Sequence, residues 1–364
     1  MNKRIGVMIA ATMSLLTFTG GAAMADSHAE ARSSLQTNLD AVVDGGSIAA
    51  IAEVRNGDKV SRGSSGSTKV NGDQPPAPSA RFRAGSITKS FTATVVLQLV
   101  GEGKLSLSDS VEHWLPGLVG NGDSITVRQL LQHMSGLPEY STDLLNRAGI
   151  PKQRYRTWAP KELVEKALEA PPSFSPGAKY EYSNTNYIVL GMIIEKVTGK
   201  PYGTEIKERI LQPVGLTHTW LPGTSPEVTG PHAHGYAAVK KNGKITSVDV
   251  TRFNPTLTGA AGEIISTTDD LNRFFRALLG GELLKPAQLK EMKDPGTAGG
   301  YGLGLEVVSL PCGTAYGHTG ETPGYVTASF TSADGTRQVT LATTPFSGGS
   351  EVAAKSLLRT ALCD

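Results

Sequence analysis

The stretch RFRAGSITKSFTATVVLQLV, residues 81–100, changes from polar to apolar near its middle. Apolar side chains then recur at every fourth position, at Ile87, Phe91, Val95 and Leu99. Further apolar residues fill the other faces of the same segment, and a helix that is apolar nearly all round belongs in the core of a protein. The sequence therefore predicts a buried helix that begins with a polar turn.

The polar turn contains Ser86 and Lys89, which are three residues apart. Side chains at this spacing share one face of a helix, so the amine can approach the hydroxyl. Burial lowers the pKa of a lysine, and a neutral amine can activate a serine as a nucleophile. The same spacing also fits a serine near a helix cap and a lysine that extends to solvent. The apolar surroundings of Lys89 favour a catalytic site over a lysine that extends to solvent.

A second polar group precedes the apolar segment that ends at Gly199, where the chain reads Tyr182-Ser183-Asn184. Ser183 or Asn184 is expected to cap the helix, which leaves Tyr182 facing outward from its start. On this stretch alone, a simple cap with a packed tyrosine is the favoured interpretation.

A third group, His318-Thr319-Gly320, ends a strand-like run. Gly320 and Gly324 allow a close approach of the backbone, and an open strand edge can pair with an extended, peptide-like ligand. A glycine-rich turn with a surface histidine is the alternative.

The remaining pattern predicts strands at both ends of the chain and helices between them. Strands are expected at 48–62, as a hairpin around Asn56-Gly57, and at 301–308, 314–318, 324–331 and 336–344. Helices are expected at 124–134, 159–169, 186–198, 267–280 and 350–361. This order indicates an α+β fold in which the two ends build one sheet.

The first 25 residues resemble an export signal, with Lys3 and Arg4 before an apolar stretch and a small-residue cleavage site, Ala23-Met24-Ala25. A membrane anchor is the alternative, but the apolar stretch is shorter than the roughly 20 residues of a spanning helix. We expect a secreted protein. Without residues 1–25, 33 basic residues balance 33 acidic ones, which gives no reason to expect nucleic acid or a membrane as a partner of the mature form.

The expected organisation is thus a signal peptide at 1–25 and one globular unit at 26–364. Its sheet part covers about 26–85 and 256–364, and its mostly helical part covers about 86–255.

Two cysteines, Cys312 and Cys363, lie near the end of the chain. In an exported protein an even number of cysteines favours a disulfide, and a bridge at the penultimate residue would hold a tail that is otherwise free to fray. Two independent buried thiols are the alternative.

The three motifs together resemble those of the serine β-lactamase and penicillin-binding protein superfamily, for which Ser-x-x-Lys and a Lys-Thr-Gly strand are a signature. With Tyr-x-Asn as the second motif and His-Thr-Gly as the third, the chain is most similar to secreted serine D-alanyl-D-alanine carboxypeptidases. The resemblance runs from about residue 35 to the C-terminus. It includes LLQHMSGL at 130–137, YGLGLEV at 301–307 and the cysteine pair. It implies a mainly antiparallel sheet flanked by helices, a helical region beside it, and a site in the cleft between them.

The resemblance also implies roles for the motif residues. Ser86 is expected to form an acyl-enzyme, with Lys89 and Tyr182 moving its proton. Asn184 is expected to orient Lys89 and to bind the amide of the ligand.

The third motif is expected to bind substrate. His318, Thr319 and Gly320 would hold its polar end, and the backbone N–H groups of Ser86 and Glu321 would form an oxyanion hole. The resemblance implies no metal or cofactor, and a monomer.

Glu306 departs from the pattern of the carboxypeptidases, which often place a cation on the strand before His-Thr-Gly to bind the terminal carboxylate of the substrate. No Lys or Arg occurs from 301 to 320. The expected function is a D-alanyl-D-alanine carboxypeptidase that acts on small peptides or peptidoglycan and is acylated by β-lactams. A β-lactamase, a D-amino-acid amidase or aminopeptidase, and an esterase are alternatives within the same chemistry. A penicillin-binding sensor without turnover is the alternative from another class.

Overall fold

The computed structural model describes residues 34–145, 153–241 and 244–364. The expected signal peptide, residues 1–25, lies outside these ranges. Within them, no helix has both the length and the apolar character needed to cross a bilayer.

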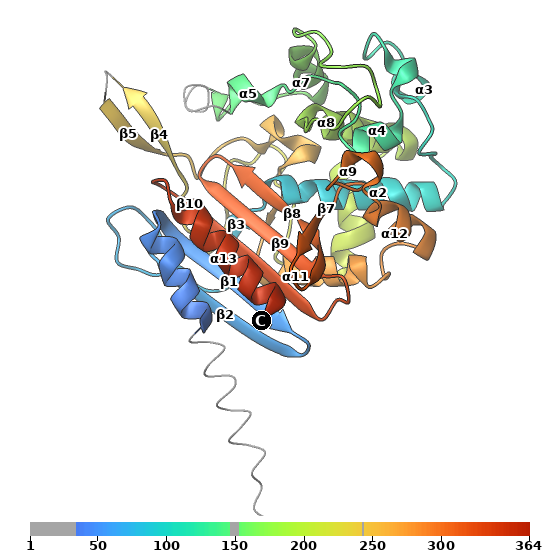
Figure 1. Ribbon diagram of the computed structural model, residues 1–364. Coiled ribbons are helices and arrows are strands. Elements are labelled where there is room, and N and C mark those ends of the chain that lie inside the picture. The colour runs from blue at the N-terminus through green and yellow to red at the C-terminus, as the bar shows by residue number, and fades with distance from the viewer. Residues whose placement is uncertain (1–33, 146–152, 242–243) are drawn as a thin grey trace, which may run out of the picture.

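A six-stranded antiparallel sheet, in the order β2-β1-β10-β9-β8-β7, forms one part of the protein (Figure 1). Its strands are β1 (Ser47–Asn56), β2 (Lys59–Gly66), β7 (Glu306–Leu310), β8 (Gly313–Thr322), β9 (Tyr325–Ser332) and β10 (Arg337–Pro345). Strand β1 pairs with β10 from Ser47 opposite Pro345 to Asn56 opposite Arg337. The two ends of the chain therefore share one sheet, and the expected α+β class is confirmed.

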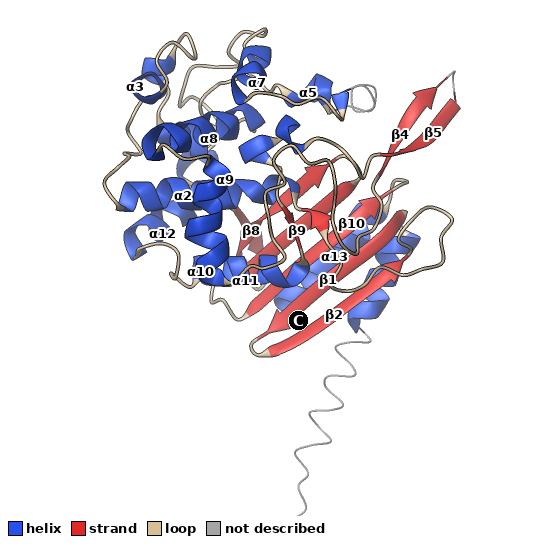
Figure 2. Ribbon diagram, turned by 180° about the vertical axis from the view of Figure 1, so that it is seen from behind, coloured by secondary structure: helices blue, strands red, loops and turns tan. Residues whose placement is uncertain are grey.

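The middle of the chain is mostly helical and lies beside the sheet (Figure 2). Its helices are α2 (Thr88–Gly101), α3 (Val111–Trp114), α4 (Val127–Leu131), α5 (Ser141–Leu144), α7 (Pro160–Ala167), α8 (Asn184–Thr198), α9 (Tyr202–Ile206), a π-helical turn (Lys207–Leu211) and α10 (Gln212–Val214). Two short strands, β3 (Phe82–Arg83) and β6 (Ile265–Ser266), pair with each other in a separate two-stranded sheet. The hairpin of β4 (Tyr236–Lys241) and β5 (Lys244–Asp249) was not predicted from the sequence.

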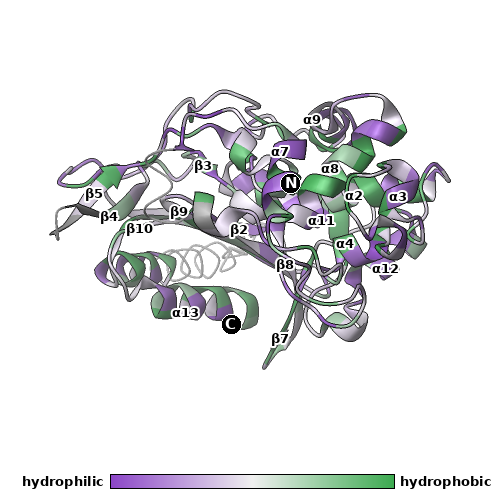
Figure 3. Cartoon of the chain, turned by 90° about the horizontal axis from the view of Figure 1, so that it is seen from above, coloured by the Kyte–Doolittle hydropathy of each residue, from purple (hydrophilic) through white to green (hydrophobic). Residues whose placement is uncertain are grey.

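Helices cover both faces of the sheet. On one face, α13 (Ser350–Cys363) packs its Leu357 and Leu362 into a small apolar core with Ala50, Ala52 and Leu341. On the other face lies α11 (Thr268–Leu279), followed by α12 (Pro286–Lys293) at the edge of the helical part. Figure 3 shows α13 on one side of the sheet and the apolar helices α2 and α8 on the opposite side.

Helix α2 is the central element of the larger core, as its apolar pattern predicts. Its Phe91 ring stacks on Phe274 of α11, with 3.6 Å between the ring centroids. The predicted polar turn at its start is a 3₁₀ turn, Gly85–Ile87, that leads into the α-helix at Thr88. Gly85 has φ +57°, and a Cβ at this position would lie 2.7 Å from the backbone nitrogen of Glu321. Only glycine therefore allows the turn to lie this close to β8.

The predicted disulfide is confirmed. Cys312, in the turn between β7 and β8, is bonded to Cys363 at the end of α13, with 5.4 Å between their Cα atoms. The bridge ties the C-terminal helix to the edge of the sheet that borders the site.

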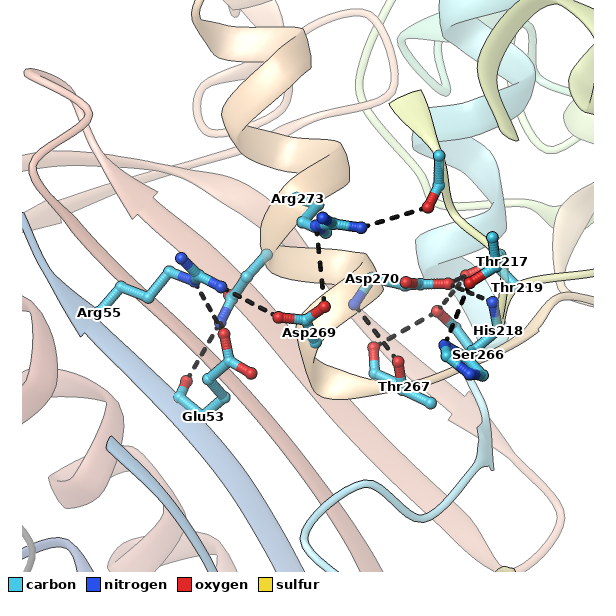
Figure 4. A network of polar contacts seen from close by, with 12 residues as sticks. Glu53, Arg55, Thr217, His218, Thr219, Ser266, Thr267, Asp269, Asp270 and Arg273 are labelled. Atoms are coloured by element: carbon cyan, nitrogen blue, oxygen red, sulfur yellow. Dashed lines mark hydrogen bonds and ion pairs between the residues drawn. The ribbon is translucent and has the colours of Figure 1, made fainter. Parts of the chain in front are cut away.

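A buried carboxylate joins β1 to α11. Glu53 is fully buried and accepts hydrogen bonds from Arg55 Nε at 2.8 Å and from Arg62 Nε at 2.7 Å. Both guanidinium groups also contact Asp269 at the start of α11, and Figure 4 shows the ion pairs of Arg55 with Glu53 and with Asp269. Asn272 of α11 donates to Glu53 at 3.2 Å. The charges of this network are thus paired and hydrogen-bonded.

We expect Glu53→Ala to lower the free energy of unfolding by about 3–5 kcal/mol, because it removes one of the two carboxylates that pair with the partly buried Arg55 and the carboxylate that accepts from the buried Asn272 amide. Urea unfolding followed by circular dichroism measures this difference. The control is Glu351→Ala, which removes an exposed carboxylate paired with Lys355 and should leave the midpoint unchanged. Equal midpoints for the two variants would contradict the role assigned to Glu53.

Candidate active site

Three segments far apart in the sequence meet at one cavity of about 570 Å³. Ser86 comes from the turn before α2, and Tyr182 from the residues just before α8. Thr319, Gly320 and Glu321 come from β8. The pairing of β7 with β8 extends from Gly313 to Gly317, and Thr319 to Glu321 pair with β9. The structure thus brings residues of all three sequence motifs together at the end of an open strand edge.

The Lys89 side chain is fully buried below this cavity. Its Nζ lies 2.9 Å from Ser86 Oγ, 2.7 Å from Asn184 Oδ1 and 2.8 Å from the backbone oxygen of Ala261. The amine is therefore held by three oxygen atoms, of which only the serine hydroxyl is able to give up a proton.

Burial lowers the pKa of Lys89 to about 7, although the carboxylates of Glu139 and Glu306 act in the opposite direction. A neutral amine has two N–H bonds and one lone pair. The oxygens of Asn184 and Ala261 can only accept, so they take the two N–H bonds. The lone pair is then left facing Ser86, which is the arrangement of a general base beside a nucleophile.

Tyr182 lies on the other side of the same amine, with 4.8 Å between Lys89 Nζ and the centre of the tyrosine ring. Burial raises the pKa of Tyr182 well above its usual value, and a hydrogen bond with Ser86 opposes this shift. At neutral pH the side chain is thus a phenol that can donate a proton, while Lys89 is the group able to accept one.

Asn184 is held by a carboxylate that the sequence did not point to. Glu139 Oε2 accepts hydrogen bonds from the backbone nitrogen of Asn184 at 2.7 Å and from its Nδ2 at 3.0 Å. Ser183 occupies the N-cap position, as predicted, but its hydroxyl donates to Pro138 O at 3.1 Å instead of capping the helix. Glu139 therefore caps α8 and turns Asn184 Oδ1 toward Lys89.

His133 supports Tyr182 from behind. The two rings are stacked with 4.2 Å between their centroids, and His133 Nδ1 accepts a hydrogen bond from the backbone of Ser183 at 3.2 Å. Burial lowers the pKa of His133 well below its usual value, so the ring is neutral. Its backbone has φ +56°, an unusual conformation for a histidine.

His318 is placed differently from its two neighbours. It is 1% exposed, and it is not among the described residues that line the cavity. Its Nε2 lies 2.8 Å from the hydroxyl of Tyr301, which does line the cavity. Burial lowers the pKa of His318, with the carboxylate of Glu306 opposing the shift. The structure therefore puts His318 behind Tyr301, which lines the cavity together with Thr319.

Glu306 lines the cavity beside Thr319. Its Oε1 accepts hydrogen bonds from the backbone nitrogen of Thr319 at 2.9 Å and from the Thr319 hydroxyl. The same oxygen lies 3.4 Å from His318 Nδ1. The donors that Thr319 presents at the strand edge are thus occupied by a carboxylate of the protein itself.

The beta-lactamase family model matches residues 36–361. The chain belongs to the beta-lactamase family. The curated relatives include the putative penicillin-binding protein PbpX of Bacillus subtilis, 33% identical over 68% of this chain, and penicillin-binding protein 4* of the same organism, 30% identical over 74%. The chain matches 58% and 62% of the length of these two relatives.

Solved structures with the same fold cover nearly the whole chain. A D-stereospecific amidohydrolase from Streptomyces sp. is 38% identical, with a TM-score of 0.83 and coverage of 91% of this chain and 98% of that one. A D-amino acid amidase from Ochrobactrum anthropi SV3 is 28% identical, with a TM-score of 0.80 and coverage of 91% and 97%.

The sequence did not point to four residues of this site: Glu139, His133, Tyr301, and Tyr180, which lines the cavity. His133 lies within the segment 130–137 and Tyr301 begins the segment 301–307, both of which carried the family resemblance. The family resemblance of these segments was therefore a signal for His133 and Tyr301, although it did not indicate what either residue does. Nothing near Glu139 in the sequence marks it, because its partner Asn184 is 45 residues away.

Proposed function

We propose that this member of the beta-lactamase family hydrolyses amides of D-amino acids or of short D-configured peptides through an acyl-enzyme on Ser86. The proposed substrate class is based on the position of Glu306. The sequence favoured a D-alanyl-D-alanine carboxypeptidase, with an amidase as an alternative, and the geometry supports the alternative. The amidohydrolase and amidase titles of the similar structures agree with this choice.

The chemical steps follow from the contacts of Lys89. Its neutral amine takes the proton of Ser86 as Oγ attacks the amide carbonyl. The backbone N–H groups of Ser86 and Glu321 face the oxygen that becomes negative, an arrangement supported by the close packing of Gly85 on Glu321. Tyr182 donates a proton to the leaving amine and regains it from Lys89. Water, deprotonated in the same way, then releases the acid and restores Ser86.

A free carboxylate on the leaving group is disfavoured at this cavity. It would have to displace Glu306 from the donors of Thr319 or lie beside it as a second negative charge. Two like charges about 4 Å apart repel by about 4 kcal/mol at the effective dielectric constant near a protein surface. A neutral amide or a small amine leaving group has no such cost.

We expect the wild-type protein to cleave N-acetyl-D-Ala-D-Ala amide with a kcat/KM at least about 10-fold above that for the free acid, equivalent to about 1.4 kcal/mol. Glu306→Gln should raise the kcat/KM for the acid by a similar factor, because the amide oxygen still accepts from Thr319 while the negative charge is gone. Release of D-alanine or its amide, measured by chromatography, gives both rates.

The matched control is Glu321→Gln, which removes a second carboxylate that lines the cavity and keeps the backbone N–H. It should leave the ratio of acid to amide cleavage near its wild-type value. A wild-type preference for the free acid, or an unchanged ratio in Glu306→Gln, would contradict the proposed substrate class.

A further inference from the structure

A second, larger cavity of about 910 Å³ lies behind the catalytic lysine. Helix α8 contributes Ile188 and Met192, and the loop after α10 contributes Leu216 and Trp220. Trp158 is also part of the wall. The described residues that line it include none that line the catalytic cavity. Its volume is in the range of about 300–1,000 Å³ that is usual for sites of small organic ligands.

One carboxyl group lies deep in the wall of this second cavity. Glu263 is 4% exposed, and its two oxygens accept hydrogen bonds from the Tyr202 hydroxyl and from the backbone nitrogen of Gly223 at 3.1 Å. In the described part of the chain no Lys, Arg or His forms an ion pair with it. Burial raises the pKa of Glu263 to about 7. A buried acid among apolar walls is stabilised as a carboxylate when a cation joins it.

The other charged groups of the cavity lie nearer its rim. Glu195 of α8 accepts a hydrogen bond from the Tyr202 backbone nitrogen at 3.2 Å, and Lys207 is exposed to solvent. Two acidic groups thus face one exposed base. This balance favours a positively charged ligand over a negatively charged one.

A short segment separates this cavity from the catalytic one. Gly259 and Ala260 line the second cavity, and the backbone oxygen of Ala260 accepts from Thr92 of α2 at 2.8 Å. The next residue, Ala261, holds Lys89 Nζ at 2.8 Å. A ligand that contacts this segment therefore contacts the backbone that positions the catalytic amine.

We propose that the second cavity binds a small organic cation with an apolar body, whose ammonium group pairs with Glu263, and that its binding is transmitted to Lys89 through residues 259–261. The apolar walls would bury the body of the ligand, and the carboxylate would select its charge. The proposed amide hydrolysis does not depend on this site.

The probe is 2-phenylethylammonium, titrated into the mature protein by calorimetry at pH 8 and followed in parallel by tryptophan fluorescence, to which Trp158 and Trp220 in the cavity wall contribute. We expect saturable binding that is at least 10-fold weaker for 2-phenylethanol and absent for phenylacetate. Glu263→Gln should weaken binding of the ammonium at least 10-fold. Gly203→Leu should block binding, because Gly203 lines the cavity and a leucine side chain there would occupy the space of the ligand. The protein should tolerate the change, since a Cβ at Gly203 meets only side-chain atoms of Leu221 at 3.6 Å and beyond.

The matched control for the location is Glu306→Gln, which removes a carboxylate from the catalytic cavity and should leave binding of the probe unchanged. Binding lost in Glu306→Gln but kept in Glu263→Gln would place the probe at the catalytic cavity and overturn the proposal. No binding, or equal binding of the alcohol, would overturn it as well.

The link to Lys89 is measured with the burst of nitrophenol that accompanies acylation of Ser86 by p-nitrophenyl acetate. Saturating 2-phenylethylammonium should change the burst rate at least twofold in the wild-type protein and not in Gly203→Leu. An unchanged rate at saturation would overturn the link. A protein that binds the probe but is not acylated by the ester would instead contradict the proposed hydrolase chemistry, so the two failures are distinguishable.

Discussion

Ser86→Ala is expected to abolish covalent labelling by penicillins and activated esters while the protein stays folded. The variant removes the hydroxyl that is proposed to attack the carbonyl, and in serine hydrolases the loss of the nucleophile lowers kcat by about 10⁶-fold. The hydroxyl contacts Lys89 at 2.9 Å and also forms a hydrogen bond with Tyr182. The loss of a single hydrogen bond costs about 1 kcal/mol of stability. Mass spectrometry of the intact protein, followed by peptide mapping, measures the label and its position.

The matched control is Ser90→Ala, one turn further along α2. Ser90 is buried and donates to the backbone oxygen of Gly304 at 2.7 Å, so its loss affects packing without touching the cavity. This variant should still be labelled at Ser86. If Ser86→Ala were labelled as strongly as the wild-type protein, the nucleophile would be a different residue.

The lifetime of the adduct separates related activities. A penicillin adduct on Ser86 that persists for minutes would mean that water releases the opened lactam slowly, as expected of an enzyme that β-lactams inhibit. Turnover within milliseconds would indicate a β-lactamase.

Much of the site could be predicted because each of its motifs begins or ends a regular element. The repeat from Ile87 to Leu99 places the helix, and the helix places Ser86 beside Lys89. Tyr182 and Thr319 were also expected at element boundaries, and they reach the same cavity. What the sequence could not give is the distance between these segments, because it depends on the packing of the sheet against the helical part.

The residues that were missed act through partners that are remote in the sequence. Glu139 matters because α8 begins next to it, and His133 because its ring stacks on Tyr182. The sequence identified Glu306 as a departure from the pattern of the carboxypeptidases. It did not predict that the Glu306 carboxylate would accept a hydrogen bond from Thr319. The hairpin of β4 and β5 was missed because it lies outside the main sheet, in a segment without the apolar alternation of a half-buried strand.

Lys89→Met is expected to reduce kcat/KM for acylation by about 10³-fold, within the range of 10²–10⁴ for the loss of a general base. Methionine matches the length of the buried stem and removes the amine. In the wild-type protein the pKa of Lys89 is lowered by burial to about 7, and only the neutral amine can accept the proton of Ser86. The rate should therefore rise about tenfold per pH unit below this pKa and become level above it. Stopped-flow acylation between pH 5 and 9 measures the profile.

Tyr182→Phe separates the two groups that could carry the proton. The pKa of Tyr182 is raised by burial, so the phenol does not ionise in this pH range, and its loss should lower the rate without moving the acidic limb of the profile. Lys89→Met, in contrast, should remove that limb. If the limb near pH 7 disappeared in Tyr182→Phe and survived in Lys89→Met, the base would be the phenolate and Lys89 would serve only to stabilise it. In the neutral amine of Lys89 the N–H bonds are taken by Asn184 and Ala261, which leaves the lone pair facing Ser86. This arrangement favours Lys89 as the base, so the acidic limb should survive in Tyr182→Phe.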